Sequence, residues 1–142
     1  MSGKRLVRFW YSRAMSRFRY GKLVRDKIVD NQIASGAKPS FRQLSTEEHK
    51  RELVNKIVEE AQEIIQAQPH EVASEIADVQ QALDDLKEKY GVTEAAVKQA
   101  QKRKNDESGA FKKGHFVEYV EVDEGDAWVR HYRAHADRYP EV

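Results

Sequence analysis

Two short clusters of carboxylates, set at helical spacing on either side of a proline, constrain this chain more than any other feature. The first cluster is Glu59, Glu60 and Glu63, and the second is Glu75 and Asp78. On an α-helix, side chains three residues apart lie on neighbouring turns of one face. Each cluster therefore contains one pair of carboxylates that can bind the same object.

Pro69 lies between the two clusters and divides the helical pattern. Proline is tolerated in the first turn of a helix and disfavoured in its interior. We therefore expect one helix to end near residues 66–68 and a second helix to start at about Pro69. A short connection folds two helices back antiparallel, so the two pairs of carboxylates can face each other across the seam.

Both predicted helices carry an apolar stripe when their residues are placed at about 100° per residue. The stripes consist of Leu53, Val54, Ile57, Val58, Ala61, Ile64 and Ile65 in the first helix, and of Val72, Ile76, Val79, Leu83, Leu86 and Tyr90 in the second. Glu60 and Glu75 lie near the margins of these stripes, whereas Asp78 lies further out. This phase predicts a site at the mouth of a groove between two helices.

Carboxylates that converge in this way repel one another unless cations are present. Hard divalent ions such as Mg²⁺ take oxygen ligands and keep several waters, which leaves room for a phosphate substrate. The competing interpretation is a solvated acidic helix face, because charged residues make up 35% of the chain. A di-iron carboxylate bundle is disfavoured because it requires Glu-x-x-His pairs, and the sequence contains none.

Length and composition limit the remaining possibilities. A chain of 142 residues is long enough for one domain with a core. It has no cysteine, which excludes disulfides and thiolate chemistry and is compatible with a reducing compartment. No apolar run approaches the roughly 18 residues that span a bilayer. We therefore expect a soluble, cytoplasmic protein with no membrane partner.

The charge is distributed unevenly. Residues 1–25 contain eight basic residues and no acidic one, while the rest of the chain has an excess of acidic residues. The segment 1–19 fits a targeting presequence, an arm that contacts nucleic acid or a neighbouring subunit, or a loose extension. We favour an extension without a catalytic role, and we expect nucleic-acid binding only through this segment.

The acidic helices are flanked by other predicted elements. Residues 20–34 show helical spacing and end before Gly36. Ser45 with Glu48 forms a capping box for the first acidic helix, and Gly91 ends the second.

The predicted helix at residues 93–104 carries a basic end, which fits either a contact to a triphosphate or a solvated turn that complements the helix dipole. Residues 108–122 predict a short strand or hairpin, since they are rich in strand formers. The tail, residues 123–142, predicts a short packed helix.

Three motifs between residues 20 and 122 resemble those of one family. They are KIVEEAQEI at residues 56–64 with ASEIADV at residues 73–79, KLVRDKI at residues 22–28, and Lys104 followed by SGAF at residues 108–111. With these motifs the chain is similar to the MazG-like all-α nucleoside triphosphate pyrophosphohydrolases, a superfamily that includes phosphoribosyl-ATP pyrophosphohydrolase.

The resemblance implies a mainly α fold, an antiparallel helical bundle of this type over residues 20–122 with a short C-terminal strand or hairpin. It also implies a homodimer or homotetramer with active sites close to the subunit interfaces. The implied reaction is hydrolysis of a nucleoside triphosphate, or of a related nucleotide such as phosphoribosyl-ATP, to the monophosphate and pyrophosphate. House-cleaning of non-canonical nucleotides is one such role. The reaction would depend on Mg²⁺, with Mn²⁺ as an alternative.

The resemblance also assigns roles by position. The implied metal ligands are Glu60, Glu63, Glu75 and Asp78. Glu59 would be a further ligand or would orient the attacking water, and Lys104, Lys22 and Arg25 would contact phosphates. The alternative hypothesis is a non-catalytic helical assembly module that binds nucleic acid through its basic N-terminus.

Overall fold

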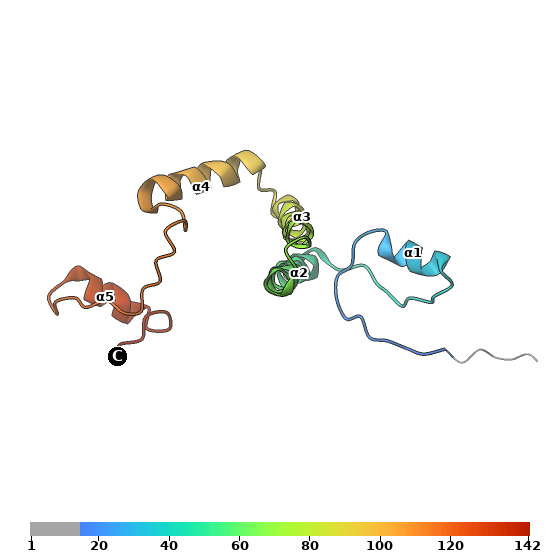
Figure 1. The fold of residues 1–142 in the computed structure, drawn as a ribbon, viewed down its shortest axis with the longest axis horizontal. Helices are drawn as coiled ribbons and strands as arrows, with labels where there is room; N and C mark the ends of the chain where they lie inside the picture. The colour runs from blue at the N-terminus through green and yellow to red at the C-terminus, as the bar shows by residue number, and fades with distance from the viewer. Residues whose placement is uncertain (1–14) are drawn as a thin grey trace, which may run out of the picture. The chain divides into compact units, whose positions relative to one another are not determined.

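The structure is a computed structural model that describes residues 15–142, so most of the predicted extension 1–19 lies outside the described residues. It is mainly helical, as the sequence predicts. Its helices are α1 (Ile28–Ala34), α2 (Thr46–Gln66), α3 (Val72–Tyr90), α4 (Glu94–Ser108) and α5 (Ala127–Ala134) (Figure 1). None of the helices within residues 15–142 combines the length and the apolar character that a bilayer crossing demands.

The chain divides into two compact units, the first ending at Val97 and the second beginning at Lys98. The first contains α1, α2 and α3, and α4 begins in it. The second contains the rest of α4 and α5. The domain limits that follow from the resemblance, at residues 20 and 122, stay predictions.

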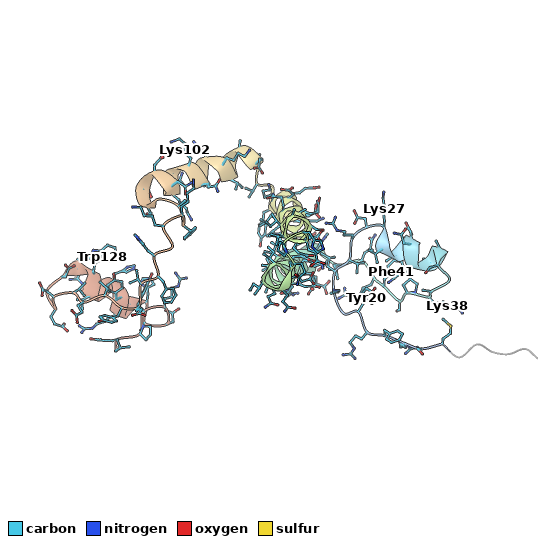
Figure 2. The ribbon with its side chains drawn as sticks, in the orientation of Figure 1. Tyr20, Lys27, Lys38, Phe41, Lys102 and Trp128 are labelled. Atoms are coloured by element: carbon cyan, nitrogen blue, oxygen red, sulfur yellow. The ribbon has the colours of Figure 1, made fainter. Side chains whose placement is uncertain are left out.

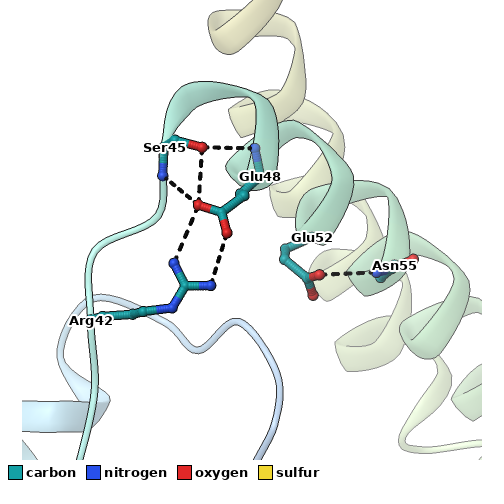
Figure 3. A network of polar contacts seen from close by, with 5 residues as sticks. All are labelled: Arg42, Ser45, Glu48, Glu52 and Asn55. Carbon is teal, nitrogen blue, oxygen red and sulfur yellow. Dashed lines mark hydrogen bonds and ion pairs between the residues drawn. The ribbon is translucent and has the colours of Figure 1, made fainter.

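The capping box predicted for α2 is confirmed (Figure 3). The Ser45 hydroxyl accepts a hydrogen bond from the Glu48 backbone N–H at 3.3 Å, and the Glu48 carboxylate accepts one from the Ser45 N–H at 3.0 Å. Arg42 donates to both Glu48 oxygens, at 2.9 and 3.2 Å. These contacts, that of Arg42 first, lower the pKa of Glu48 to about 2. The start of α2 is thus fixed by both backbone and side-chain hydrogen bonds.

The connection between α2 and α3 is a turn that contains Pro69. α2 ends at Gln66, as predicted, but α3 begins at Val72 rather than at Pro69. The reason is local, because Glu71 closes the turn: its carboxylate accepts a hydrogen bond from the Gln68 N–H at 2.9 Å, and its own N–H donates to the Gln68 carbonyl at 2.8 Å. The turn reverses the chain direction, as the sequence predicts.

α3 ends at a left-handed glycine. Gly91 has φ 65° and ψ 26°, a conformation that costs little only without a Cβ atom. Val92 N–H then donates to the Lys87 carbonyl and Gly91 N–H to the Glu88 carbonyl, which satisfies the last carbonyls of the helix.

α2 and α3 pack side by side and antiparallel, and among the described helices no other pair packs as extensively (Figure 1). The Lys50 ammonium lies 4.6 Å from the centre of the Tyr90 ring, near the start of α2 and the end of α3. Within residues 15–142, the buried side chains are those of Leu53, Ala82 and Glu60, and all three lie in this seam. The core of the first unit is therefore the α2–α3 seam.

The apolar stripes are only partly used by this seam. On α3 the half-buried apolar residues are Val72, Val79 and Leu86, whereas Ile76 and Leu83 are exposed. The predicted centre of the stripe was therefore wrong by about one position. The physical reason is that the apolar stripe of α3 is wider than its contact with α2. In a single hairpin, part of the stripe therefore stays exposed.

Two further predictions differ from the structure. The helix predicted for residues 20–34 is confined to α1, because the chain before it leaves helical geometry at Gly21 (φ 62°) and is drawn toward α2 and α3 by ion pairs. The strand predicted within residues 108–122 is not confirmed. Residues 116–122 form no strand and pair with no other described segment, and a strand is defined by such pairing.

The second unit is held together by short-range contacts. The Asp126 carboxylate caps α5 by accepting from the Trp128 N–H at 2.9 Å. Arg133 donates to Glu124 and Glu141 at 2.8 to 3.1 Å. Trp128 stacks on Tyr132 with ring centres 5.8 Å apart. The short helix predicted in the tail is confirmed as α5. In Figure 2, the label Lys102 marks α4 and the label Trp128 marks α5.

Candidate metal centre

Three carboxylates from the two packed helices converge on one point. Oxygen atoms of Glu60 on α2 and of Glu75 and Asp78 on α3 all lie within 4.8 Å of one another. Glu60 is 7% exposed, and the other two are half-buried. Three of the four metal ligands implied by the resemblance are therefore neighbours in space.

The fold brings these residues together through helix phase. Glu60 follows the buried Leu53 by seven residues and so lies on the same face of α2. Glu75 precedes the buried Ala82 by the same interval on α3, which places it in the facing seam. Asp78 lies one turn further along α3 and is half-buried.

Glu63 is placed beside this group. The pKa of Glu75 is raised above its ordinary value, first by burial and then by the negative charges of Glu63 and Asp78. Glu63 thus lies within reach of the three-oxygen group without being part of it.

Glu59, which the resemblance treats as a further ligand or a water-orienting base, is instead paired with two lysines. Its carboxylate lies 2.5 Å from the Lys22 ammonium and 3.3 Å from that of Lys56. These contacts, that of Lys22 first, lower the pKa of Glu59 despite partial burial. Glu59 remains ionised but lies outside the three-oxygen group.

Two more ion pairs reach the three-oxygen group itself. Lys56 binds Glu60 one turn along α2, and Arg25 binds Asp78 from the segment before α1. Burial lowers the pKa of Lys56, but hydrogen bonds to Glu60 and Glu59 outweigh that effect, and its pKa is raised. The predicted phosphate-binding residues Lys22 and Arg25 are thus brought to the acidic clusters.

Lys56 is the residue that the sequence analysis missed. It precedes Glu59 by three residues and Glu60 by four, and this spacing puts oppositely charged side chains on one helix face. The spacing alone was a sufficient signal.

The net formal charge of the site equals, with opposite sign, that of one divalent cation. Three of the five carboxylates in the two acidic clusters, Glu59, Glu60 and Asp78, are paired with the cations Lys22, Lys56 and Arg25. Five negative and three positive charges leave a formal charge of −2. Oxygen ligands at 2.0–2.1 Å from Mg²⁺ are separated by up to about 4 Å across its octahedron. The three-oxygen group is slightly wider, at up to 4.8 Å, and its donors are all carboxylate oxygens, the ligand type that Mg²⁺ and Mn²⁺ take.

Lys104, the third predicted phosphate contact, lies on the exposed surface of α4 in the second unit. Its role stays a prediction from the resemblance.

A scan against protein-family models, a search of curated proteins and a search of solved structures each found no match to this chain.

Proposed function

We propose that this protein is a nucleoside triphosphate pyrophosphohydrolase that works with Mg²⁺ or Mn²⁺. The observation that carries the proposal is the convergence of Glu60, Glu75 and Asp78 from two helices on one oxygen group. Two of these carboxylates are paired with Lys56 and Arg25, but the five carboxylates of the two clusters outnumber the three cations, and a divalent ion would compensate this excess of negative charge. The motifs at residues 22–28, 56–64 and 73–79 supply the expectation of the reaction.

The roles of the side chains follow from their positions. Glu60, Glu75 and Asp78 would hold the metal ion, and Glu63 would join them through its place beside Glu75. When bound, a divalent ion lowers the pKa of a coordinated water and neutralises charge on a phosphate chain. Because Glu59 lies outside the oxygen group, orienting the attacking water suits it better than metal ligation.

We propose that Lys22 and Arg25 bind the substrate. Both lie in the segment before α1, and each forms an ion pair with a carboxylate of the acidic clusters. Lysine and arginine side chains in such a position bind phosphate oxygens through charge-assisted hydrogen bonds. We propose that a triphosphate, or the triphosphate part of phosphoribosyl-ATP, is held between these cations and the metal ion.

The test is pyrophosphate release from a panel of canonical and modified nucleoside triphosphates and from phosphoribosyl-ATP, with Mg²⁺ and with chelator. Asp78→Asn removes a charge from the oxygen group, and Asp85→Asn is the matched control, because Asp85 lies on the same helix and accepts its hydrogen bond from Gln81. We expect about a 10³-fold loss in Asp78→Asn, since metal stabilisation of the transition state amounts to several kcal/mol.

Asp85→Asn should retain the wild-type rate. Release that survives chelator, or an equal loss in both variants, would overturn the proposal. Release from no substrate would instead favour the nucleic-acid-binding assembly module. The ranking of the panel identifies the base, and a preference for modified bases would support house-cleaning.

We further propose that the protein is a homo-oligomer built on the α2–α3 hairpin, as a dimer or a tetramer. Val54, Val58 and Ile65 each follow an inward-facing residue of α2 by one position and are exposed, and Ile76 and Leu83 do the same on α3. Because the helices are antiparallel, the same rotation of about 100° turns both exposed stripes to one side of the hairpin. Glu63 and Asp78, each three residues after a seam carboxylate, fall on the opposite side.

An apolar face of this kind marks a protein contact. Two hairpins that meet through it form a four-helix arrangement that leaves both acidic groups accessible on the outer sides, whereas the resemblance implies active sites close to the subunit interfaces. We expect Val58→Asp to lower the mass measured by light scattering to that of a smaller species. Val97→Asp, a matched change at an exposed valine of α4, should not. A wild-type protein that is monomeric at all concentrations would contradict the proposal.

The expected compartment is the cytoplasm. The absence of cysteine from the sequence is compatible with a reducing environment.

A further inference from the structure

Two cationic side chains from one short segment contact the acidic clusters, but they contact different kinds of carboxylate. Arg25 binds Asp78, which belongs to the three-oxygen group, and Lys22 binds Glu59, which does not. Both carboxylates are about one-third exposed. This difference separates a cation that competes with a metal ion from one that does not.

The third cation, Lys56, is held more firmly than Arg25. Its side chain is 20% exposed, lies on α2 itself and binds both Glu59 and Glu60. The Arg25 side chain is 59% exposed and starts from a non-helical segment before α1. An exposed ion pair of this type is weak, whereas Lys56 would have to break two ion pairs.

We propose that Arg25 is an internal counter-ion of the metal site, which a divalent cation displaces from Asp78. The inference rests on the proposed function and adds regulation of the same site. A guanidinium and a divalent cation that share one carboxylate repel each other at a separation of a few ångströms. The weaker and more exposed partner therefore leaves, and its guanidinium becomes available to a phosphate.

The opposite role is also well defined. An arginine that stays hydrogen-bonded to a metal-ligating carboxylate orients that ligand, and the loss of such a partner weakens metal binding by about 10- to 100-fold. Displacement and orientation thus predict changes of opposite sign when Arg25 is replaced. A measurement of metal affinity alone distinguishes them, without any assay of turnover.

The experiment is calorimetric titration of the full-length protein with Mg²⁺ and with Mn²⁺, for wild type, Arg25→Gln and Lys22→Gln. Lys22→Gln is the matched control. Lys22 lies three residues before Arg25 and carries the same charge, but its partner, Glu59, lies outside the oxygen group. We expect Arg25→Gln to bind the metal about two- to fivefold more tightly than Lys22→Gln, as removal of a weak competing pair allows. Circular dichroism checks that the helices are retained.

Equal affinities in the two variants, or weaker binding in Arg25→Gln, would overturn the displacement of Arg25. Asp78→Asn separates this failure from a failure of the proposed metal site. If Asp78→Asn abolishes binding while Arg25→Gln behaves like Lys22→Gln, only the counter-ion role is wrong. If Asp78→Asn binds as the wild type does, the metal site itself is wrong.

Discussion

The two units of the chain use ion pairs on different scales. In the first unit, Lys22 reaches Glu59 across 37 residues and Arg25 reaches Asp78 across 53. In the second, Arg133 binds Glu141 and Glu124, which are eight and nine residues away. Long-range pairs form only when the helical hairpin has folded, whereas local pairs need little tertiary structure. The candidate site therefore depends on folding in a way that the second unit does not.

Loss of the α2–α3 seam should have the largest effect on the candidate site. Leu53 lies on α2, is 2% exposed and is buried in the seam with α3. We expect Leu53→Ala to cost about 2–5 kcal/mol, the usual range for a buried leucine, and to abolish metal binding because Glu60 shares its helix face. Thermal unfolding followed by circular dichroism, with metal calorimetry beside it, measures both.

The control for Leu53→Ala lies in the second unit. Val129→Ala removes a half-buried side chain from α5 and should leave metal affinity unchanged. The interpretation of the seam as the base of the site would be untenable if Leu53→Ala kept the wild-type metal affinity.

A smaller effect is expected at the start of α2, and it depends on pH. The pKa of Glu48 is lowered to about 2, first by the hydrogen bond from Arg42. A carboxylate whose pKa is depressed in the folded state stabilises that state when the pH is above the pKa of the unfolded chain, near 4.5. This contribution disappears as the pH falls toward 2. Glu48→Gln should therefore lower Tm at pH 7 and leave it almost unchanged at pH 2.

The measurement is the difference in Tm between the wild type and Glu48→Gln, taken at pH 7 and at pH 2. The difference at pH 2 is the control for the difference at pH 7. A Tm difference that persists at pH 2 would show that the Glu48 side chain stabilises α2 through something other than its charge.

The smallest effect is expected in the second unit. The hydrogen bonds of Arg133, first to Glu141 and then to Glu124, raise its pKa, and the same contact lowers the pKa of Glu141. We expect Arg133→Gln to change the near-ultraviolet circular dichroism of the neighbouring Trp128 and Tyr132 stack while leaving metal affinity at the wild-type value. Altered metal affinity would show that the two units are coupled in function.

Local sequence rules predicted much of the fold, and they failed where tertiary contacts decide. The Ser45 cap and the left-handed Gly91 were predictable because each depends on a few neighbouring residues. The start of α1 was not, because ion pairs to α2 and α3 draw the preceding segment away from helical geometry. The strand predicted within residues 108–122 required a pairing partner that no local pattern specifies.

The candidate site shows the same division. Helical spacing was enough to place Glu60, Glu75 and Asp78 near one another. It could not show that Glu59 is paired with Lys22, because that contact depends on the path of the chain before α1. The pair between Lys56 and Glu60 was available from the spacing of four residues.

The proposed function requires a divalent cation bound by the carboxylates of α2 and α3. Crystals grown with Mn²⁺, examined by anomalous diffraction at the manganese edge, test this most directly. We predict a manganese peak between Glu60, Glu75 and Asp78, with Arg25 no longer bound to Asp78. Well-ordered carboxylates with no peak between them, or manganese bound only elsewhere on the protein, would contradict the metal centre and the function proposed from it.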